Sequence, residues 1–160
     1  MDYPDAEGLG QAFETNHWLI HRLVDGLNHA DSVIQPPYQG NCLNWVLGHI
    51  VVSRHRVLSL LEETPVWGDD EISLYDTGSQ PITGDGQGLK FEDVLAALDT
   101  AEERIQAALS GISSAGLNQI VETSRGIKPV GKHIAGRNWH VTYHIGQLEL
   151  LREIAQSLSS

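Results

Sequence analysis

The sequence of 160 residues has little positive charge, and this limits the partners that it can bind. Its Lys and Arg residues number 10 against 21 Asp and Glu, so the net charge at pH 7 is −11 with neutral histidines. A surface of this sign repels DNA, RNA and anionic lipid headgroups. We therefore expect no nucleic-acid partner and no membrane partner.

Cysteine and long apolar runs are also scarce. Cys42 is the one cysteine, and a single thiol cannot form an internal disulfide. The N-terminal residues do not resemble a basic segment followed by an apolar signal core. The apolar stretch 46–52 is interrupted by Gly48 and His49, and it is far shorter than the ~20 residues that span a bilayer. These features favour a cytoplasmic protein without a membrane span.

The remaining composition is that of an ordinary globular protein. Hydrophobic residues make up 41% of the chain and charged residues 19%. A chain of this length can bury roughly two-thirds of its unfolded surface in one core. We expect a single domain over residues 1–160. The sequence has no Cys-x-x-Cys pair, phosphate-binding glycine loop or Ser, His and Asp motif.

Apolar residues recur at helical spacing in several segments, which predicts an all-α fold. The predicted helices cover residues 8–29, 41–62, 91–112 and 133–157, with Asn41 as the N-cap of the second.

The segments between these helices contain helix-breaking residues. Pro and Gly residues interrupt 32–41, and many Gly, Asp, Ser and Pro residues make 65–89 a long crossover loop with room for one short helical turn. A β-like stretch covers 119–123, followed by a Gly- and Pro-containing segment up to Gly131. Four helices with one long connection after the second predict an antiparallel four-helix bundle.

Two histidines lie on one face of the last predicted helix. His140 and His144 are four residues apart, on the face that also carries Leu148 and Leu151, so they should point inward. Buried polar groups without partners cost about 1–3 kcal/mol, so this pair needs a partner. A shared metal ion and ordinary hydrogen bonds in the core are both open at this point. His49, among apolar neighbours on the second helix, could supply a third ligand.

Other histidines provide a control for this interpretation. His17 and His21 have the same spacing on the first helix, so the spacing alone is not decisive. For that pair we favour boundary packing or a wall that faces a substrate over metal binding. His29, His55 and His133 lie near helix ends or on the opposite flank, and we expect them at the surface.

A few more residues have chemistry to consider. Cys42 could have a lowered thiol pKa, because a helix N-terminus favours the thiolate, but a small packed thiol is the simpler interpretation. Gln147, one turn beyond His144, could orient a ligand or a bound water, or it could be a hydrogen-bonding residue at the core edge. Tyr143 and Trp139 are interpreted as packing residues rather than acid catalysts.

Two stretches of sequence together point to a known family. They are Asn44-Trp45-Val46-Leu47-Gly48-His49-Ile50 and Asn138-Trp139-His140-Val141-Thr142-Tyr143-His144-Ile145-Gly146-Gln147-Leu148. They resemble the two signature stretches of the DinB/YfiT-like superfamily, which consists of small, often dimeric helical-bundle proteins. That family is unrelated to the polymerase that shares the DinB name. The resemblance extends from the first helix through the last.

The resemblance implies a metal site. In the family, one histidine from the second helix and a His-x-x-x-His pair from the last helix bind a divalent metal, and the matching residues are His49, His140 and His144. Three imidazoles leave at least one coordination position open, as in catalytic zinc sites. Zinc or nickel would suit these ligands, and manganese or iron would be compatible. Val141 occupies the position of the general-base Glu in zincins, so metalloprotease activity is disfavoured.

The resemblance also suggests a reaction class. Characterised relatives include thiol S-transferases that use bacillithiol or mycothiol and a mycothiol-dependent maleylpyruvate isomerase. It therefore implies a metal-dependent enzyme that activates a low-molecular-weight thiol or water for attack on a small electrophilic substrate, and a homodimer. The alternative is a non-enzymatic dimeric bundle in which the histidines bind metal without catalysis or bind no metal.

Overall fold

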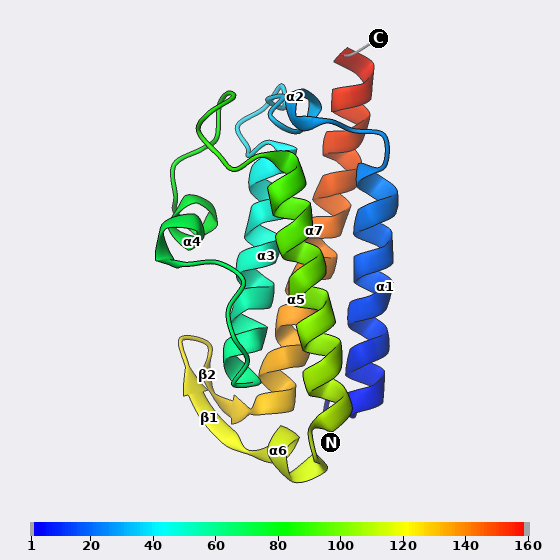
Figure 1. Cartoon of the computed structure of the whole chain (residues 1–160), viewed down its shortest axis with the longest axis vertical. Coiled ribbons are helices and arrows are strands. Elements are labelled where there is room, and N and C mark those ends of the chain that lie inside the picture. Colours follow the sequence, from blue (N-terminus) through cyan, green and yellow to red (C-terminus); the bar gives the residue numbers. More distant parts are fainter. Residues whose placement is uncertain (1, 159–160) are drawn as a thin grey trace.

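The computed structural model describes residues 2–158 and is dominated by four long helices (Figure 1). These are α1 (Ala6–Val24), α3 (Leu43–Leu60), α5 (Phe91–Gly111) and α7 (Val130–Leu158). The shorter elements are α2 (His29–Ser32), α4 (Asp69–Tyr75), α6 (Ser114–Asn118) and an antiparallel hairpin of β1 (Ile120–Thr123) and β2 (Gly126–Pro129). The structure confirms the predicted helical bundle with its long connection between the second and third long helices.

The long helices pack as a ring in which each contacts two others. Helices α1 and α3 both contact α5 and α7. Helices α1 and α7 run in one direction along the bundle, and α3 and α5 run in the other (Figure 1). Each helix therefore has one parallel and one antiparallel neighbour, because the chain between α3 and α5 returns along the bundle. This arrangement places the first half of α3 against the middle of α7.

Two predicted helix ends differ from the structure. The first helix ends at Val24 rather than near residue 29, because the chain turns at Gly26 with a φ of 77°, a conformation that glycine adopts without strain. The prediction that Asn41 caps the second long helix is wrong. Cys42 is the N-cap of α3, and its side chain makes no capping hydrogen bond.

The connections are more structured than the sequence pattern predicted. The predicted short helical turn within 65–89 is α4, and the β-like stretch at 119–123 is β1. Strand β2 and helix α6 were not predicted. On α7, no atom lies within 4 Å of a Cβ added at Gly136 or at Gly146, so neither glycine is needed there for close helix packing.

Helix α3 is buried on nearly all sides and contributes to both apolar clusters of the core. One apolar cluster surrounds Leu47 and Leu148, and a second surrounds Leu58 and Ile134 near the other end of the bundle. Buried apolar surface contributes about 25 cal/mol per Å² to folding. Within residues 2–158, no helix is long and apolar enough to cross a membrane. Because α3 also carries buried polar side chains, those side chains need partners inside the bundle.

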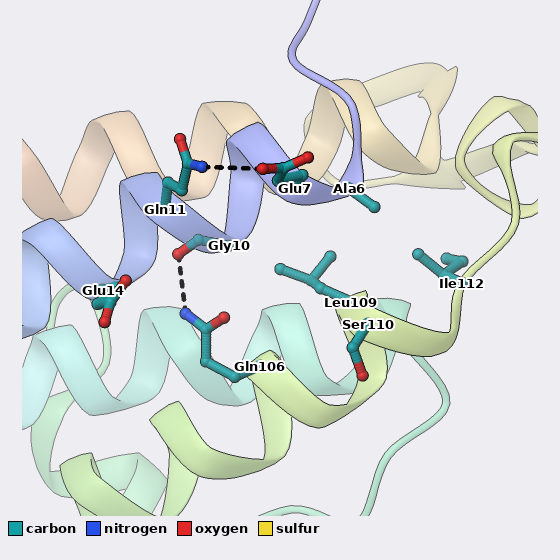
Figure 2. A pocket seen from close by; sticks show the side chains of 9 residues that line it. All are labelled: Ala6, Glu7, Gly10, Gln11, Glu14, Gln106, Leu109, Ser110 and Ile112. Carbon is teal, nitrogen blue, oxygen red and sulfur yellow. Dashed lines mark hydrogen bonds between the residues drawn. The ribbon is translucent and has the colours of Figure 1, made fainter.

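A buried ion pair links α3 to α5. Arg54 is 0% exposed, and its Nη1 lies 2.9 Å from Oε2 of Glu102 and donates to the carbonyl of Leu98. The Gln106 amide donates to Oε1 of Glu102 and, across to α1, to the carbonyl of Gly10, each at 2.8 Å. Figure 2 shows this contact between Gln106 and Gly10. Three helices are therefore tied together around one buried cation.

Removing the carboxylate from this pair should destabilise the protein strongly. We expect Glu102→Ala to lower the free energy of unfolding by about 3–5 kcal/mol, because it leaves the buried Arg54 without a counterion. Exposed Glu103, the next residue on α5, is the control, and Glu103→Ala should change the value by less than about 0.5 kcal/mol. Urea unfolding measures both. Equal losses in the two variants would contradict this role of the pair.

Candidate metal centre

Three imidazole rings converge where α3 and α7 pack together. The Nε2 atom of His140 lies 3.2 Å from Nε2 of His49 and 3.1 Å from Nε2 of His144. His49 and His140 are 91 positions apart in the sequence. The ligand atoms of all three histidines lie within 4.8 Å of one another, and His49 and His144 are buried while His140 is half-buried. The structure therefore brings together the three side chains that the sequence singled out.

Hydrogen bonds fix the orientation of two of these rings. Nδ1 of His49 lies 2.8 Å from the backbone carbonyl of Tyr75, and Nδ1 of His144 lies 2.7 Å from Oε1 of Gln147. These oxygens accept, so each Nδ1 carries the proton and each Nε2 directs a lone pair toward the centre. Gln147 is therefore a residue that orients an imidazole of the cluster.

Burial keeps the three rings neutral. It is the largest cause of the lowered pKa of His49 and of His144. The pKa of His140 falls to about 4, first because of burial and then because the other two histidines disfavour a further positive charge. Neutral imidazoles have lone pairs available at neutral pH, which metal binding requires.

The first signature stretch builds the support for His49. Tyr75 donates from its hydroxyl to Oδ1 of Asn44 at 3.0 Å, and the Trp45 ring stacks on His49 with ring centroids 4.9 Å apart. A Cβ added at Gly48 would lie 2.2 Å from the Tyr75 ring. Glycine at this position therefore lets Tyr75 lie against α3, where its carbonyl reaches His49. Sequence reasoning missed Tyr75, which comes from α4 and lies outside both signature stretches.

The second signature stretch sets the rotation of α7. Asn16 of α1 donates to Oδ1 of Asn138 at 2.9 Å and to Oγ1 of Thr142 at 3.0 Å. Both partners belong to α7, so this side of the helix is held against α1. His140 and His144 lie on the side that meets α3.

The donor set fits a divalent metal ion. With Zn–N distances of about 2.0–2.1 Å, tetrahedral ligands are about 3.3–3.4 Å apart, and neighbouring octahedral ligands are about 3.0 Å apart. The observed Nε2–Nε2 separations of 3.1 and 3.2 Å lie between these values. Either geometry leaves positions for a small molecule, and the partial exposure of His140 provides access.

A second cluster forms on the other side of the bundle. Nε2 of His21 and Nε2 of His17 lie 2.6 and 3.3 Å from Oδ1 of Asp99. Nδ1 of His17 accepts a hydrogen bond from Arg54 at 3.2 Å. A histidine that binds metal through Nε2 carries its proton on Nδ1, which would face this arginine donor. The cluster therefore fits a hydrogen-bonded carboxylate better than a metal ion.

The remaining histidines, His29, His55 and His133, differ in how deeply they are buried. His133 was expected at the surface, but it is buried, with Nε2 3.4 Å from the carbonyl of Val121 and Nδ1 3.4 Å from Oγ1 of Thr123. These contacts attach the hairpin to the start of α7, and the hairpin covers His133. His29 and His55 are half-buried.

Three further candidates differ in environment. Cys42 is fully buried, and burial raises the pKa of its thiol, so the packed-thiol interpretation applies and the lowered pKa does not. Trp139 and Tyr143 were interpreted as packing residues, but they are 70% and 60% exposed. Tyr143 nevertheless packs edge-to-face on the buried His144 ring, with ring centroids 5.4 Å apart.

The hollow shown in Figure 2 lies between α1 and α5 and has a volume of about 420 Å³. Its lining includes the carboxylates of Glu7 and Glu14 and the amide of Gln106. Among the described residues that line it there is no histidine, cysteine, lysine or arginine. This hollow is therefore a weaker candidate for a reactive site than the three-histidine centre.

Filling the space above Gly48 should damage the site. We expect Gly48→Ala to displace Tyr75, to cost about 1–3 kcal/mol of stability by overpacking, and to weaken divalent-metal binding about 10–100-fold through the lost contact to His49. Gly136→Ala on α7, where no atom obstructs the added Cβ, should keep the native metal affinity and raise stability by about 0.5–1 kcal/mol, because alanine favours a helix interior over glycine. Urea unfolding and metal titration test this, and native values for Gly48→Ala would show that the contact is dispensable.

Comparisons with known proteins complete the description of the site. Comparison with curated proteins gives no match. Among solved structures, the crystal structure of a conserved protein from Enterococcus faecalis is similar, with a TM-score of 0.74 and 11% sequence identity over 95% of this chain and 97% of that chain. At this identity the likeness shows the fold alone. The DinB superfamily matches residues 12–148, a range that includes all three converging histidines, and the chain therefore belongs to the DinB superfamily.

Proposed function

We propose that this protein is a metal-dependent enzyme in which His49, His140 and His144 bind one divalent ion. The observation that carries the proposal is the convergence of three Nε2 atoms at 3.1 and 3.2 Å, with two of the rings held by hydrogen bonds. Zinc or nickel suits three imidazoles best, and manganese or iron is compatible. The reaction that we propose is attack by a low-molecular-weight thiol, or by water, on a small electrophilic substrate.

The chain contributes positioning and a protected environment to this reaction. A divalent ion held by the three histidines would supply a Lewis acid that lowers the pKa of a bound thiol or water toward neutrality. The Tyr75 carbonyl and Gln147 hold His49 and His144 in place. In the thiol reaction the S–H bond breaks and the proton passes to solvent. The sulfur then bonds to the electrophilic carbon, whose leaving group departs with its electron pair.

The family resemblance supports bacillithiol or mycothiol as the thiol cosubstrate. It supports an S-transferase-like reaction, with related hydrolase or isomerase chemistry as variants of the same attack. We also propose one domain over residues 1–160, since the apolar clusters draw on helices from α1 to α7. A cytoplasmic location is supported by the single cysteine, Cys42, which is buried and unpaired with another thiol.

The metal assignment predicts the behaviour of histidine variants. Untagged protein purified without added metal should contain about one divalent ion per chain, and His144→Ala should lose it because one of three donors is removed. His21→Ala, which removes a histidine from the other cluster, should keep the metal. Elemental analysis measures the content. Unchanged metal in His144→Ala would refute the ligand assignment.

The enzyme assignment predicts turnover that needs both metal and thiol. Metal-loaded protein should accelerate conjugation of a low-molecular-weight thiol to a small electrophile such as monobromobimane, and chelation of the metal should abolish the acceleration. Loss of product fluorescence on chelation and its return with added metal measure this dependence. Bound metal without thiol- or water-dependent turnover across an electrophile panel would instead support the non-catalytic bundle.

We propose that the protein forms a homodimer through an exposed apolar stripe on α7. Trp139, Tyr143 and Leu150 share one face of this helix and are 70%, 60% and 56% exposed. The double change Trp139→Glu with Leu150→Glu should convert the dimer to a monomer in sedimentation equilibrium. Ile127→Glu, at another exposed apolar residue, is the control. A monomeric native protein, or a dimeric double variant, would contradict the proposal.

A further inference from the structure

A small basic pocket lies next to the three-histidine centre. Its volume is about 270 Å³, and it lies between the end of α3, the start of α7 and the hairpin. Its polar lining consists of Arg56, Ser59, Thr123, Ser124, His133 and Arg137. In a chain with a net charge of −11, this concentration of arginine and histidine is a local exception.

Arg137 is the unusual residue of this pocket. It is only 8% exposed, and within residues 2–158 it has no hydrogen-bond or ion-pair partner. The other buried arginine, Arg54, has Glu102, and Arg56 in the same pocket has Asp76. A buried cation without a counterion is unfavourable. Because Arg137 lines the pocket, an anion that enters the pocket can reach it and neutralise its charge.

The pocket lies beside the metal centre, along the same two helices that carry the three histidines. Arg137 lies one turn before His140 on α7, about 4.5 Å along the axis, and residues with this spacing share a helix face. Arg56 lies two turns after His49 on antiparallel α3. The charge of Arg137 acts on both His140 and His49. A molecule bound at Arg137 can therefore extend to the three imidazoles.

The charges around Arg137 favour an anion. Burial lowers its pKa to about 10, and the neighbouring Arg125 and Arg56 contribute in the same direction. Asp76 is the acidic side chain that acts on Arg137, but its Oδ1 is 2.5 Å from Nη2 of Arg56. Arg56 and Asp76 cancel each other's charge, so Arg137 and Arg125 leave this region with an excess of positive charge.

We propose that Arg137 binds a carboxylate of the small molecule whose reacting group reaches the three-histidine centre, an inference that rests on the proposed function. A planar guanidinium pairs with a carboxylate through two parallel hydrogen bonds. The hydroxyls of Thr123 and Ser124 line the same pocket and offer further donors. The volume suits a carboxylate with a short carbon chain. This carboxylate belongs either to the thiol or to the electrophile, and the two cases can be separated.

The first experiment tests anion binding without metal. Metal-free protein is titrated with succinate and with its neutral diamide, and chemical shifts of the hairpin amides are followed by NMR. Succinate should bind, the diamide should not, and Arg137→Gln should weaken succinate binding at least ~10-fold, as expected for a lost charge-assisted hydrogen bond. Arg137→Lys should fall between, because it keeps the charge without the paired donors. Exposed Arg22 on α1 provides the control Arg22→Gln, which should bind as the native chain does.

The second experiment finds which reactant carries the carboxylate. Cobalt-loaded protein is titrated with 3-mercaptopropionate and 2-mercaptoethanol, and thiolate-to-cobalt absorption is measured. If the thiol carries the carboxylate, 3-mercaptopropionate binds at least ~10-fold more tightly, and Arg137→Gln removes the preference. If the electrophile carries the carboxylate, the two thiols bind with equal affinity, and succinate still binds at Arg137.

The outcomes separate this inference from the proposed function. Absence of succinate binding to the native protein, or equal binding to the native protein and a folded Arg137→Gln variant, overturns the carboxylate inference even if metal binds. Failure of the three histidines to bind cobalt overturns the proposed function, and the succinate titration still decides the role of Arg137.

Discussion

The hydrogen bond from His49 to the backbone carbonyl of Tyr75 is the contact on which the candidate site depends. It fixes which nitrogen of His49 faces the other histidines, and it requires the connection after α3 to return against that helix. The absence of a side chain at Gly48 permits this approach, since a Cβ there would overlap the Tyr75 ring. The long connection is therefore part of the site, because its carbonyl orients an imidazole and Asn44 anchors its tyrosine.

The two buried arginines, Arg54 and Arg137, differ in whether a carboxylate pairs with them. The buried Arg54 is fully enclosed and is matched by Glu102, which makes it a structural cation that joins helices. Arg137 is nearly as buried and has no such partner among the described residues, yet it lines a pocket beside His140. We propose that the same side-chain type thus has two roles, a structural one for Arg54, which the fold pairs with a carboxylate, and an anion-binding one for Arg137, which it does not. The acidic surface elsewhere repels small anions, so the basic pocket is a favoured place for an anion to bind.

Much of the fold could be predicted from the sequence, because long amphipathic helices have a local signal. The spacing of Phe13, Ile20 and Val24, all buried in the structure, was sufficient for α1. Helix ends were less predictable, since the end of α1 depends on the backbone conformation of Gly26. His133 was misplaced at the surface because only the hairpin, which folds back over α7, buries it.

By itself the sequence determined the helical pattern, the acidic character and, through its two signature stretches, which three histidines to examine. Residues close in sequence share a helix face, so the pairing of His140 with His144 could be derived from spacing alone. Only the tertiary structure decided that His49 meets them, that Tyr75 orients it and that Arg137 lies buried and unpaired nearby. These contacts join segments that are distant in the chain, and their formation depends on helix direction, rotation and the path of the connection, which no local pattern specifies.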